Sequence, residues 1–129
     1  DQIRAQGNVR LFRSHHPDFR DGEQKRDFVY VQDVVDVLHF ALDKPLARGI
    51  YNLGSGEART FLDLVRAVFA ELGAPENIEF VDTPVEIRDK YQYFTEARMS
   101  SLAEAGYGQP FHTLEEGVKS YVGRLLART

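Results

Sequence analysis

Residues 60–73 constrain the fold most strongly, because they combine a start signal, an apolar face and a stop signal for one helix. Thr60 and Asp63 have the spacing of a capping box. Apolar residues then recur every three or four positions, which is typical of a helix that buries one face. Gly73 stands where a helix-ending glycine is favoured. Thr113 and Glu116 repeat the capping-box spacing and predict a final helix.

Short apolar runs alternate with helical stretches along the rest of the chain. The first residues are typical of the end of a helix. We predict strands over residues 9–12, 28–31, 50–53 and 78–81, and further helices over 33–42 (with Asp33 as N-cap) and 96–105. Residues 82–93 are predicted to be irregular. This alternation favours an α/β arrangement with parallel strand pairing. Residues 13–26 form a long polar loop, and long loops in compact domains tend to be functional or mobile.

Composition excludes several classes of protein. A chain of 129 residues can form a single domain, so we treat 1–129 as one compact piece. The lack of cysteine excludes disulfides and thiolate metal sites. Net charge is −4 without a strong basic cluster, which argues against nucleic-acid binding. No apolar run approaches the roughly 18–20 residues of a membrane span. We therefore expect a cytoplasmic protein that does not enter a membrane.

Arg26 is the first candidate for a binding residue. It follows the polar loop and precedes the predicted strand 28–31, and arginine can hold phosphate through two parallel hydrogen bonds. The alternative is a surface arginine paired with Asp27 or Asp33. Tyr91 and Tyr93 present a similar choice, since such aromatic side chains either stack on a base or sugar or cover the edge of a core.

Two other segments carry weaker signals. The Gly-Ser-Gly turn at 54–56 offers backbone donors that could cradle phosphate, but its spacing differs from the dinucleotide-binding motif, so we favour a tight turn. His15, His16, Asp18 and Asp21 fit no recognised metal-ligand spacing, and we predict no metal site.

The order of three motifs resembles the end of extended short-chain dehydrogenases, the superfamily that includes sugar-nucleotide epimerases and dehydratases. These motifs are RDFVYVQDVVDV, then GIYNLGSGEARTFLDLV, then a short helix that ends at AGY. A narrower resemblance covers DKYQYFTEARMSSLAEAGYGQPFHTLEEGVKSYVGRLL, which is similar to the ADP-glyceromanno-heptose 6-epimerase family in its aromatic-plus-FT pattern and its AGY, PF, T and EGV series. Together the matches span nearly the whole chain.

The resemblance implies an α/β fold that is the C-terminal substrate-binding portion of a Rossmann-type enzyme whose N-terminal Rossmann half is missing here. Family members are much longer, and their glycine-rich NADP loop and catalytic Tyr-x-x-x-Lys pair lie upstream. Neither motif occurs in this sequence. The resemblance thus implies that NADP is bound mainly by the missing part, that no catalytic residue lies here, and that the chain alone is inactive.

Residue by residue, the resemblance assigns substrate binding to Arg26 and Tyr91. It also assigns the lining of the ADP-sugar pocket to the stretch after the first strand, namely Phe12, Arg13, Ser14 and His15. Residues 14–25 form a longer loop than in some family members.

The implied activity is epimerisation at C6 of ADP-glycero-manno-heptose, by oxidation to a ketone and return of hydride to the other face, in the synthesis of lipopolysaccharide heptose precursors. One alternative is an epimerase or dehydratase of the same superfamily that acts on another nucleotide sugar. A second is a non-catalytic module that binds sugar nucleotides. We also expect a homo-oligomer, because the helix at 33–42 is apolar on more than one side.

Overall fold

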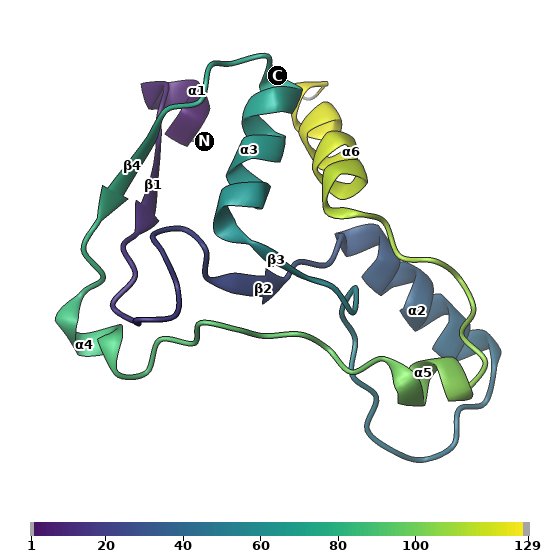
Figure 1. Cartoon of the computed structure of the whole chain (residues 1–129). Helices are drawn as coiled ribbons and strands as arrows, with labels where there is room; N and C mark the ends of the chain where they lie inside the picture. Colours follow the sequence, from purple (N-terminus) through teal and green to yellow (C-terminus); the bar gives the residue numbers. More distant parts are fainter. Residues whose placement is uncertain (1, 128–129) are drawn as a thin grey trace.

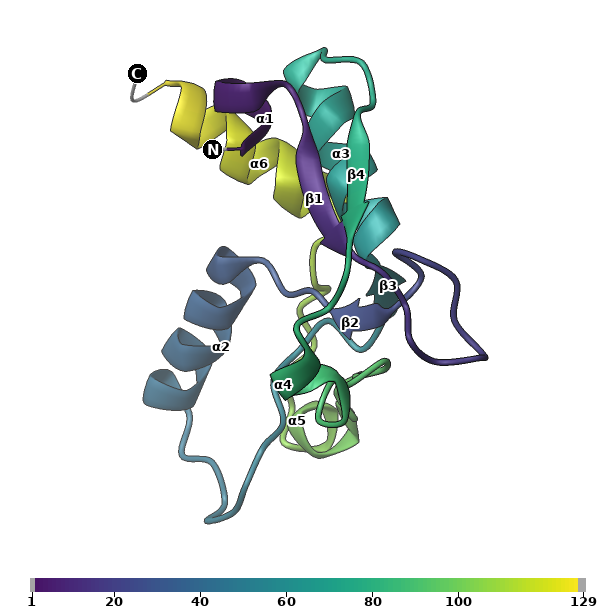
Figure 2. The same ribbon diagram turned by 90° about the vertical axis from the view of Figure 1, so that its left-hand side faces the viewer.

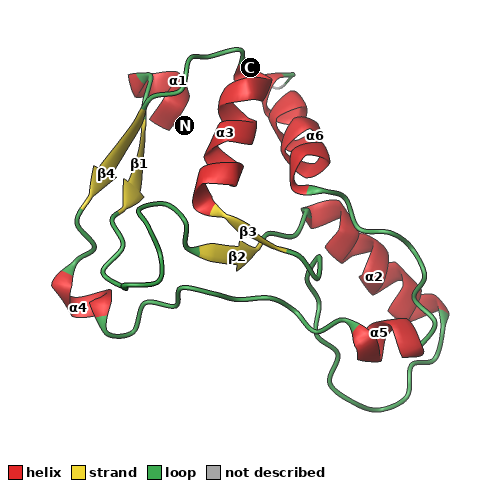
Figure 3. Ribbon diagram, viewed as in Figure 1, coloured by secondary structure: helices red, strands yellow, loops and turns green. Residues whose placement is uncertain are grey.

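The computed structural model describes residues 2–127, which contain two separate two-stranded sheets (Figures 1 and 3). In chain order the elements are α1 (Gln2–Gln6), β1 (Val9–Phe12), β2 (Lys25–Asp27), α2 (Val31–Asp43), β3 (Ala58–Thr60), α3 (Phe61–Leu72), β4 (Ile78–Val81), α4 (Val85–Arg88), α5 (Ser100–Glu104) and α6 (Leu114–Leu126). No helix in this part of the chain is both long and apolar enough to span a membrane.

The two strand pairs differ in direction. β1 and β4 run parallel, with Val9 opposite Ile78 and Phe12 opposite Val81. β2 and β3 run antiparallel, with Arg26 opposite Arg59. Parallel pairing is therefore confirmed for the first pair, whereas it is wrong for the second. On the other side of β2, the Lys25 amide donates to the Tyr93 carbonyl at 2.8 Å, which brings the segment after α4 alongside the strand.

Both capping boxes are confirmed. The Thr60 hydroxyl accepts from the Asp63 amide at 2.9 Å, and the Asp63 carboxylate accepts from the Thr60 amide at 3.0 Å. Thr113 and Glu116 make the same reciprocal contacts at the start of α6. Gly73 ends α3 with φ of 61°, a left-handed conformation that glycine adopts without steric cost. The helices α3 and α6 lie side by side in both ribbon views (Figures 1 and 2).

The predicted strand at 28–31 is wrong. The strand lies just before it, in β2, and helix α2 already begins at Val31. The apolar side chains of this run pack on helices instead of joining a sheet: the rings of Phe28 and Phe61 lie 5.4 Å apart, and Gly117 of α6 fits closely against Tyr30. Strand propensity reports a fit to a half-buried surface, and packing against helices satisfies the same residues here.

Asp33 is not an N-cap, because Tyr30 occupies that position. Asp33 lies in the first turn of α2, is only 3% exposed, and accepts from His112 just before α6. The His112 backbone amide donates at 3.0 Å, and the His112 Nδ1 lies 2.5 Å from the second carboxylate oxygen. This pair joins the start of α2 to the start of α6.

Three further predictions need correction. Residues 50–53 form no strand, because Tyr51 and Leu53 pack on the core cluster of Val37, Leu102 and Tyr107 that joins α2 to α5. The helix expected over 96–105 shortens to α5, since the Ala97 amide donates to Asp27 of β2 instead of joining the helix. The stretch 82–93 contains the short helix α4.

Candidate functional site

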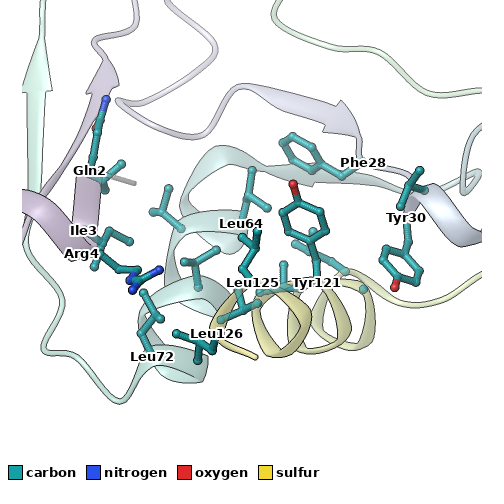
Figure 4. Close-up of a pocket in the computed structure, with 18 of the residues that line it drawn as sticks. Gln2, Ile3, Arg4, Phe28, Tyr30, Leu64, Leu72, Tyr121, Leu125 and Leu126 are labelled. Carbon is teal, nitrogen blue, oxygen red and sulfur yellow. The ribbon is translucent and has the colours of Figure 1, made fainter. Parts of the chain in front are cut away.

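An apolar groove of about 820 Å³ lies between α1, β1, α3 and α6 (Figure 4). Leu64 and Tyr121 line it from α3 and α6, and Ile3 lines it from α1. None of the binding residues predicted from the sequence lies in this groove. Its surface is chiefly hydrocarbon, which suits contact with another apolar surface better than contact with a charged nucleotide.

Arg26 lies in the middle of β2, where backbone carbonyl groups orient its guanidinium group. Its Nη1 donates to the Lys25 carbonyl at 2.8 Å, and its Nη2 donates to the Gln92 carbonyl. The guanidinium carbon lies 5.8 Å from the ring centre of Phe61 and 5.5 Å from that of Tyr91. Among residues 2–127, Arg26 forms no ion pair with a carboxylate, so both surface pairings considered for it, with Asp27 and with Asp33, are wrong.

Arg59 lies opposite Arg26 on β3, and carboxylates compensate its positive charge. Arg59 faces Arg26 in the strand register, but it pairs with Glu115 at 2.7 Å and with Asp63 at 3.3 Å. Its charge is thereby neutralised by two carboxylates. The partners of Arg26 are neutral carbonyl groups, which hold the guanidinium in place and leave its positive charge uncompensated. Such an arginine is suited to an anionic ligand.

Tyr91 connects Arg26 to Phe12 at the end of β1. The rings of Phe12 and Tyr91 meet edge to face at 6.1 Å, and Tyr91 meets Tyr93 at 5.3 Å. Burial raises the pKa of the Tyr91 hydroxyl, while the Arg26 charge lowers it by less. The hydroxyl is therefore a neutral donor at neutral pH. Thus Phe12, Arg26 and Tyr91, far apart in sequence, come together in one site.

The start of the loop after β1 lies beside this site. Arg13 forms ion pairs with Asp21 at 3.5 Å and Asp82 at 3.7 Å. The Ser14 amide donates to Asp21 at 2.7 Å, and the His15 amide donates to the Tyr93 hydroxyl at 3.0 Å. These contacts fold the loop toward the aromatic side chains. The side chains of Arg13 and His15 stay exposed.

The rest of the loop has internal contacts of its own. The His16 ring lies 5.0 Å from Tyr93 and 5.4 Å from Phe19, and Tyr93 also contacts Phe19 at 5.4 Å. The amide of Asp18 donates to His16 Nδ1 at 3.3 Å. Tyr93 therefore contacts the loop through both the His16 and the Phe19 ring.

The Gly-Ser-Gly turn at 54–56 holds a carboxylate of the same chain. Asp27 accepts from the amide and the hydroxyl of Ser55, both at 2.6 Å, from the Gly56 amide at 3.0 Å and from the Ala97 amide at 2.9 Å. A Cβ atom at Gly54 would lie 2.5 Å from the Asp27 carboxylate, so only glycine permits this approach. The donors that could have cradled phosphate are occupied, and the turn serves the fold.

Sequence reasoning missed three contributors to the site. Phe61 belongs to the apolar face predicted for residues 60–73, yet its ring also lies beneath Arg26. The carbonyl group of Gln92 and the buried side chain of Gln24 gave no signal, because a backbone acceptor and an isolated glutamine form no pattern in a sequence.

Comparison with known proteins first identifies the class of proteins that share this fold. The model of the NAD dependent epimerase/dehydratase family matches residues 2–54. Among solved structures, UDP-glucose 4-epimerase of Thermus thermophilus, in complex with NAD, matches with a TM-score of 0.76 at 25% identity, over 95% of this chain and 36% of that one. The chain thus has the α/β fold found in part of the Rossmann-type epimerases and dehydratases of nucleotide sugars.

Within this class the relatives are more particular. The chain is 50% identical over 126 residues to ADP-L-glycero-D-manno-heptose-6-epimerase of Nitratidesulfovibrio vulgaris, and 44% identical over 134 residues to that of Fusobacterium nucleatum. These matches cover 98% and 99% of this chain, but only 39% and 40% of the relatives. The structure of the Helicobacter pylori epimerase matches with a TM-score of 0.76 at 28% identity, over 98% of this chain and 35% of that one. The resemblance to heptose epimerases is thereby confirmed, and the chain spans about two fifths of the length of the curated relatives.

The Asp27 contacts predict how stability depends on pH. Burial raises the pKa of this carboxyl, but the bonds from Ser55, Ala97 and Gly56 outweigh burial and hold the pKa below its ordinary value of 3.8. The resulting stabilisation is fully present above pH 3.8 and is lost as the pH falls through the folded-state value. In Asp27→Asn, the side-chain NH2 group cannot accept the hydrogen bonds that a carboxylate oxygen accepts. The free energy of unfolding should therefore fall by about 2–3 kcal/mol at pH 7.

Urea unfolding at pH 7 and pH 3 checks this prediction. The stability difference between the original chain and Asp27→Asn should shrink at pH 3. Asp36→Asn, at an exposed position on α2, is the control and should change stability by less than about 0.5 kcal/mol. An Asp27→Asn penalty equal to that of the control at pH 7 would refute the role given to this carboxylate.

Proposed function

We propose that this chain supplies the substrate-binding part of an NADP-dependent ADP-glycero-manno-heptose 6-epimerase. The observation that carries the proposal is the uncompensated guanidinium of Arg26, held between the rings of Tyr91 and Phe61. Arg26 and Tyr91 are also the positions that match substrate-binding residues of the heptose epimerase family. Curated relatives at 44–50% identity carry this activity in their names.

The chain's own residues would bind and orient the substrate. Arg26 binds the diphosphate of the ADP-sugar, and Phe12 and Tyr91 form an aromatic wall for its nucleoside or sugar. Arg13, Ser14 and His15 line the same pocket from the start of the loop. Binding energy from the nucleotide is thus used to hold the reacting carbon in position, which lowers the entropic cost of the chemical step.

The residues described here do not fit the cofactor. The one glycine-rich turn suited to phosphate, at 54–56, is filled by Asp27. We therefore assign NADP, together with the acid/base residues, to the part of the relatives that this chain does not span. When bound there, NADP would accept and return the hydride at C6. A cytoplasmic location and a role in making lipopolysaccharide heptose precursors accompany this proposal.

The alternative is an epimerase or dehydratase that acts on another nucleotide sugar. It is supported by UDP-glucose 4-epimerase, which matches the fold with the same TM-score as the heptose epimerase structure. Competition between ADP-linked and UDP-linked sugars for the complete protein separates these readings. The remaining alternative is a non-catalytic module that binds sugar nucleotides. The gene sequence before Asp1 tests it, since a glycine-rich fingerprint and a Tyr-x-x-x-Lys pair in frame would exclude the module.

In the complete protein, Arg26→Ala should weaken binding of the ADP-sugar by about 1.5–3 kcal/mol, the range for losing a hydrogen bond to a charged group. Binding of NADP should be nearly unchanged. Arg26→Lys should recover part of the affinity, since a lysine keeps the charge without the planar fork. Arg66→Ala, which removes an exposed arginine paired with Glu76, is the matched control. An unchanged KM for the ADP-sugar in Arg26→Ala would overturn the assignment.

The 129-residue chain alone should bind NADP weakly and should not turn over an ADP-heptose. NADP binding should be weak because the Asp27 carboxylate occupies the turn at 54–56, and turnover should be absent because the sequence has no Tyr-x-x-x-Lys pair. Isothermal titration calorimetry with NADP is the direct check. Binding in the micromolar range would mean that the cofactor site lies in this part of the protein after all.

We further propose that the protein forms homo-oligomers and that the chain alone self-associates. Apolar side chains remain uncovered on α2, where Leu38 is 55% and Leu42 is 85% exposed, and the groove between α1 and α6 adds more apolar surface. Large bare apolar patches favour association. Sedimentation equilibrium at micromolar concentration should show species heavier than 14.7 kDa. A 14.7 kDa monomer that binds no hydrophobic dye would contradict this prediction.

A further inference from the structure

Two polar side chains beside the Arg26 site are almost fully buried. Gln24 and Thr83 are each 1% exposed, and each donates to a backbone carbonyl at the end of β1. The Gln24 Nε2 donates to the Phe12 carbonyl at 3.2 Å, and the Thr83 hydroxyl donates to the Arg13 carbonyl at 3.0 Å. We call Gln24 and Thr83 the carbonyl clamp, because they hold two successive carbonyl groups.

Gln24 also contacts Phe61, through its backbone. Its backbone carbonyl accepts from the Phe61 amide at 3.1 Å. Phe61 lies beneath the Arg26 guanidinium, whereas Phe12 meets the ring of Tyr91. Gln24 is therefore hydrogen-bonded to the backbones of both Phe12 and Phe61, and it precedes Arg26 by only two positions. A change in its side chain would alter where Phe12 lies relative to Arg26.

Thr83 plays the matching part on the other side of the loop. The Arg88 Nε donates to the Thr83 carbonyl at 2.7 Å, so α4 holds Thr83 in place. The Arg13 amide in turn donates to the Val81 carbonyl at 2.8 Å. The chain leaving β1 is thus fixed from β4 and α4 at the point where it turns into the loop.

Stability alone does not explain a glutamine at position 24. Its Oε1 is buried and makes no hydrogen bond within residues 2–127. An unsatisfied buried acceptor costs roughly 1–3 kcal/mol. An apolar side chain of similar volume would avoid that cost. What only the amide supplies is a donor that reaches the Phe12 carbonyl.

We propose that the carbonyl clamp consists of positioning residues, which set the distance between Phe12 and Arg26 and thereby the affinity for the nucleotide sugar. Neither side chain is expected to touch the ligand; each acts through the backbone of the residue that does. This inference rests on the proposed function of the Arg26 site.

Steady-state kinetics of the complete protein with an ADP-heptose tests the proposal. Gln24→Met keeps the volume and removes the donor. Thr83→Val keeps the shape and removes the hydroxyl, whereas Thr83→Ser keeps the hydroxyl. We expect KM for the ADP-sugar to rise about three- to tenfold in Gln24→Met and Thr83→Val, as for the loss of one buried hydrogen bond, and to return near its original value in Thr83→Ser. The kcat and the Kd for NADP should change by less than about twofold in all three variants.

Gly73→Ala is the control for a purely structural effect. Gly73 has φ of 61° at the end of α3, so alanine there is strained, although no atom lies within 4 Å of the added Cβ. This variant should lower Tm and leave KM unchanged. If Gln24→Met and Thr83→Val behave as Gly73→Ala does, the clamp is merely structural and the proposal is wrong.

The remaining outcomes are also decisive. If Gln24→Met does not fold, the Thr83→Val and Thr83→Ser pair decides: equal KM values in the two would overturn the proposal. If the unmodified protein neither binds nor converts any ADP-sugar, the proposed function itself fails. That result is distinct from a failure of the clamp, which would appear as normal substrate use with unchanged KM in the variants.

Discussion

The Asp27 carboxylate organises the centre of this chain. Its four hydrogen bonds join β2 to the turn at 54–56 and to the segment that leads into α5. Because Asp27 faces that turn, its neighbour Arg26 is left to the opposite side, toward Phe61 and Tyr91. The fold thus separates two adjacent charges: the negative one accepts hydrogen bonds from three backbone amides and one hydroxyl, and the positive one stays uncompensated by any carboxylate among residues 2–127. Gly54 makes this possible, since a side chain there would collide with the carboxylate.

Around this anchor, the site is assembled from four separate segments. β1 contributes Phe12, β2 contributes Arg26, α3 contributes Phe61, and the stretch after α4 contributes Tyr91. The large apolar groove lies elsewhere, between α1 and α6. A polar ligand and an apolar partner would therefore meet different faces of the molecule. This separation agrees with the proposal that the chain binds a nucleotide sugar on one face and packs against other protein surfaces on another.

Local signals predicted local structure well. The capping pairs at Thr60 and Thr113, and the glycine at position 73, were sufficient to place both ends of α3 and the start of α6, because capping depends on residues a few positions apart. The strand expected at 28–31 was wrong, since its apolar residues pack on helices, and a sequence does not show which surface an apolar run will meet. Tyr91 and Arg26 were singled out, and the structure brings them together. Phe61, Gln24 and Gln92 were missed because their part in the site depends on contacts that no local pattern encodes.

The pairing of β1 with β4 has a consequence for the order of folding. Arg10 and Glu79, which meet across these two strands, are 69 residues apart, and Phe12, Arg26 and Phe61 of the site lie between them. Closing so long a loop carries an entropic cost before the parallel pair returns any stabilisation. Helix α3, with its own cap and stop, needs no such closure to begin forming. Phe12, at the end of β1, can therefore take its place beside Tyr91 only after the distant strand has docked. The candidate site is thus completed late, when most of the chain is already in position.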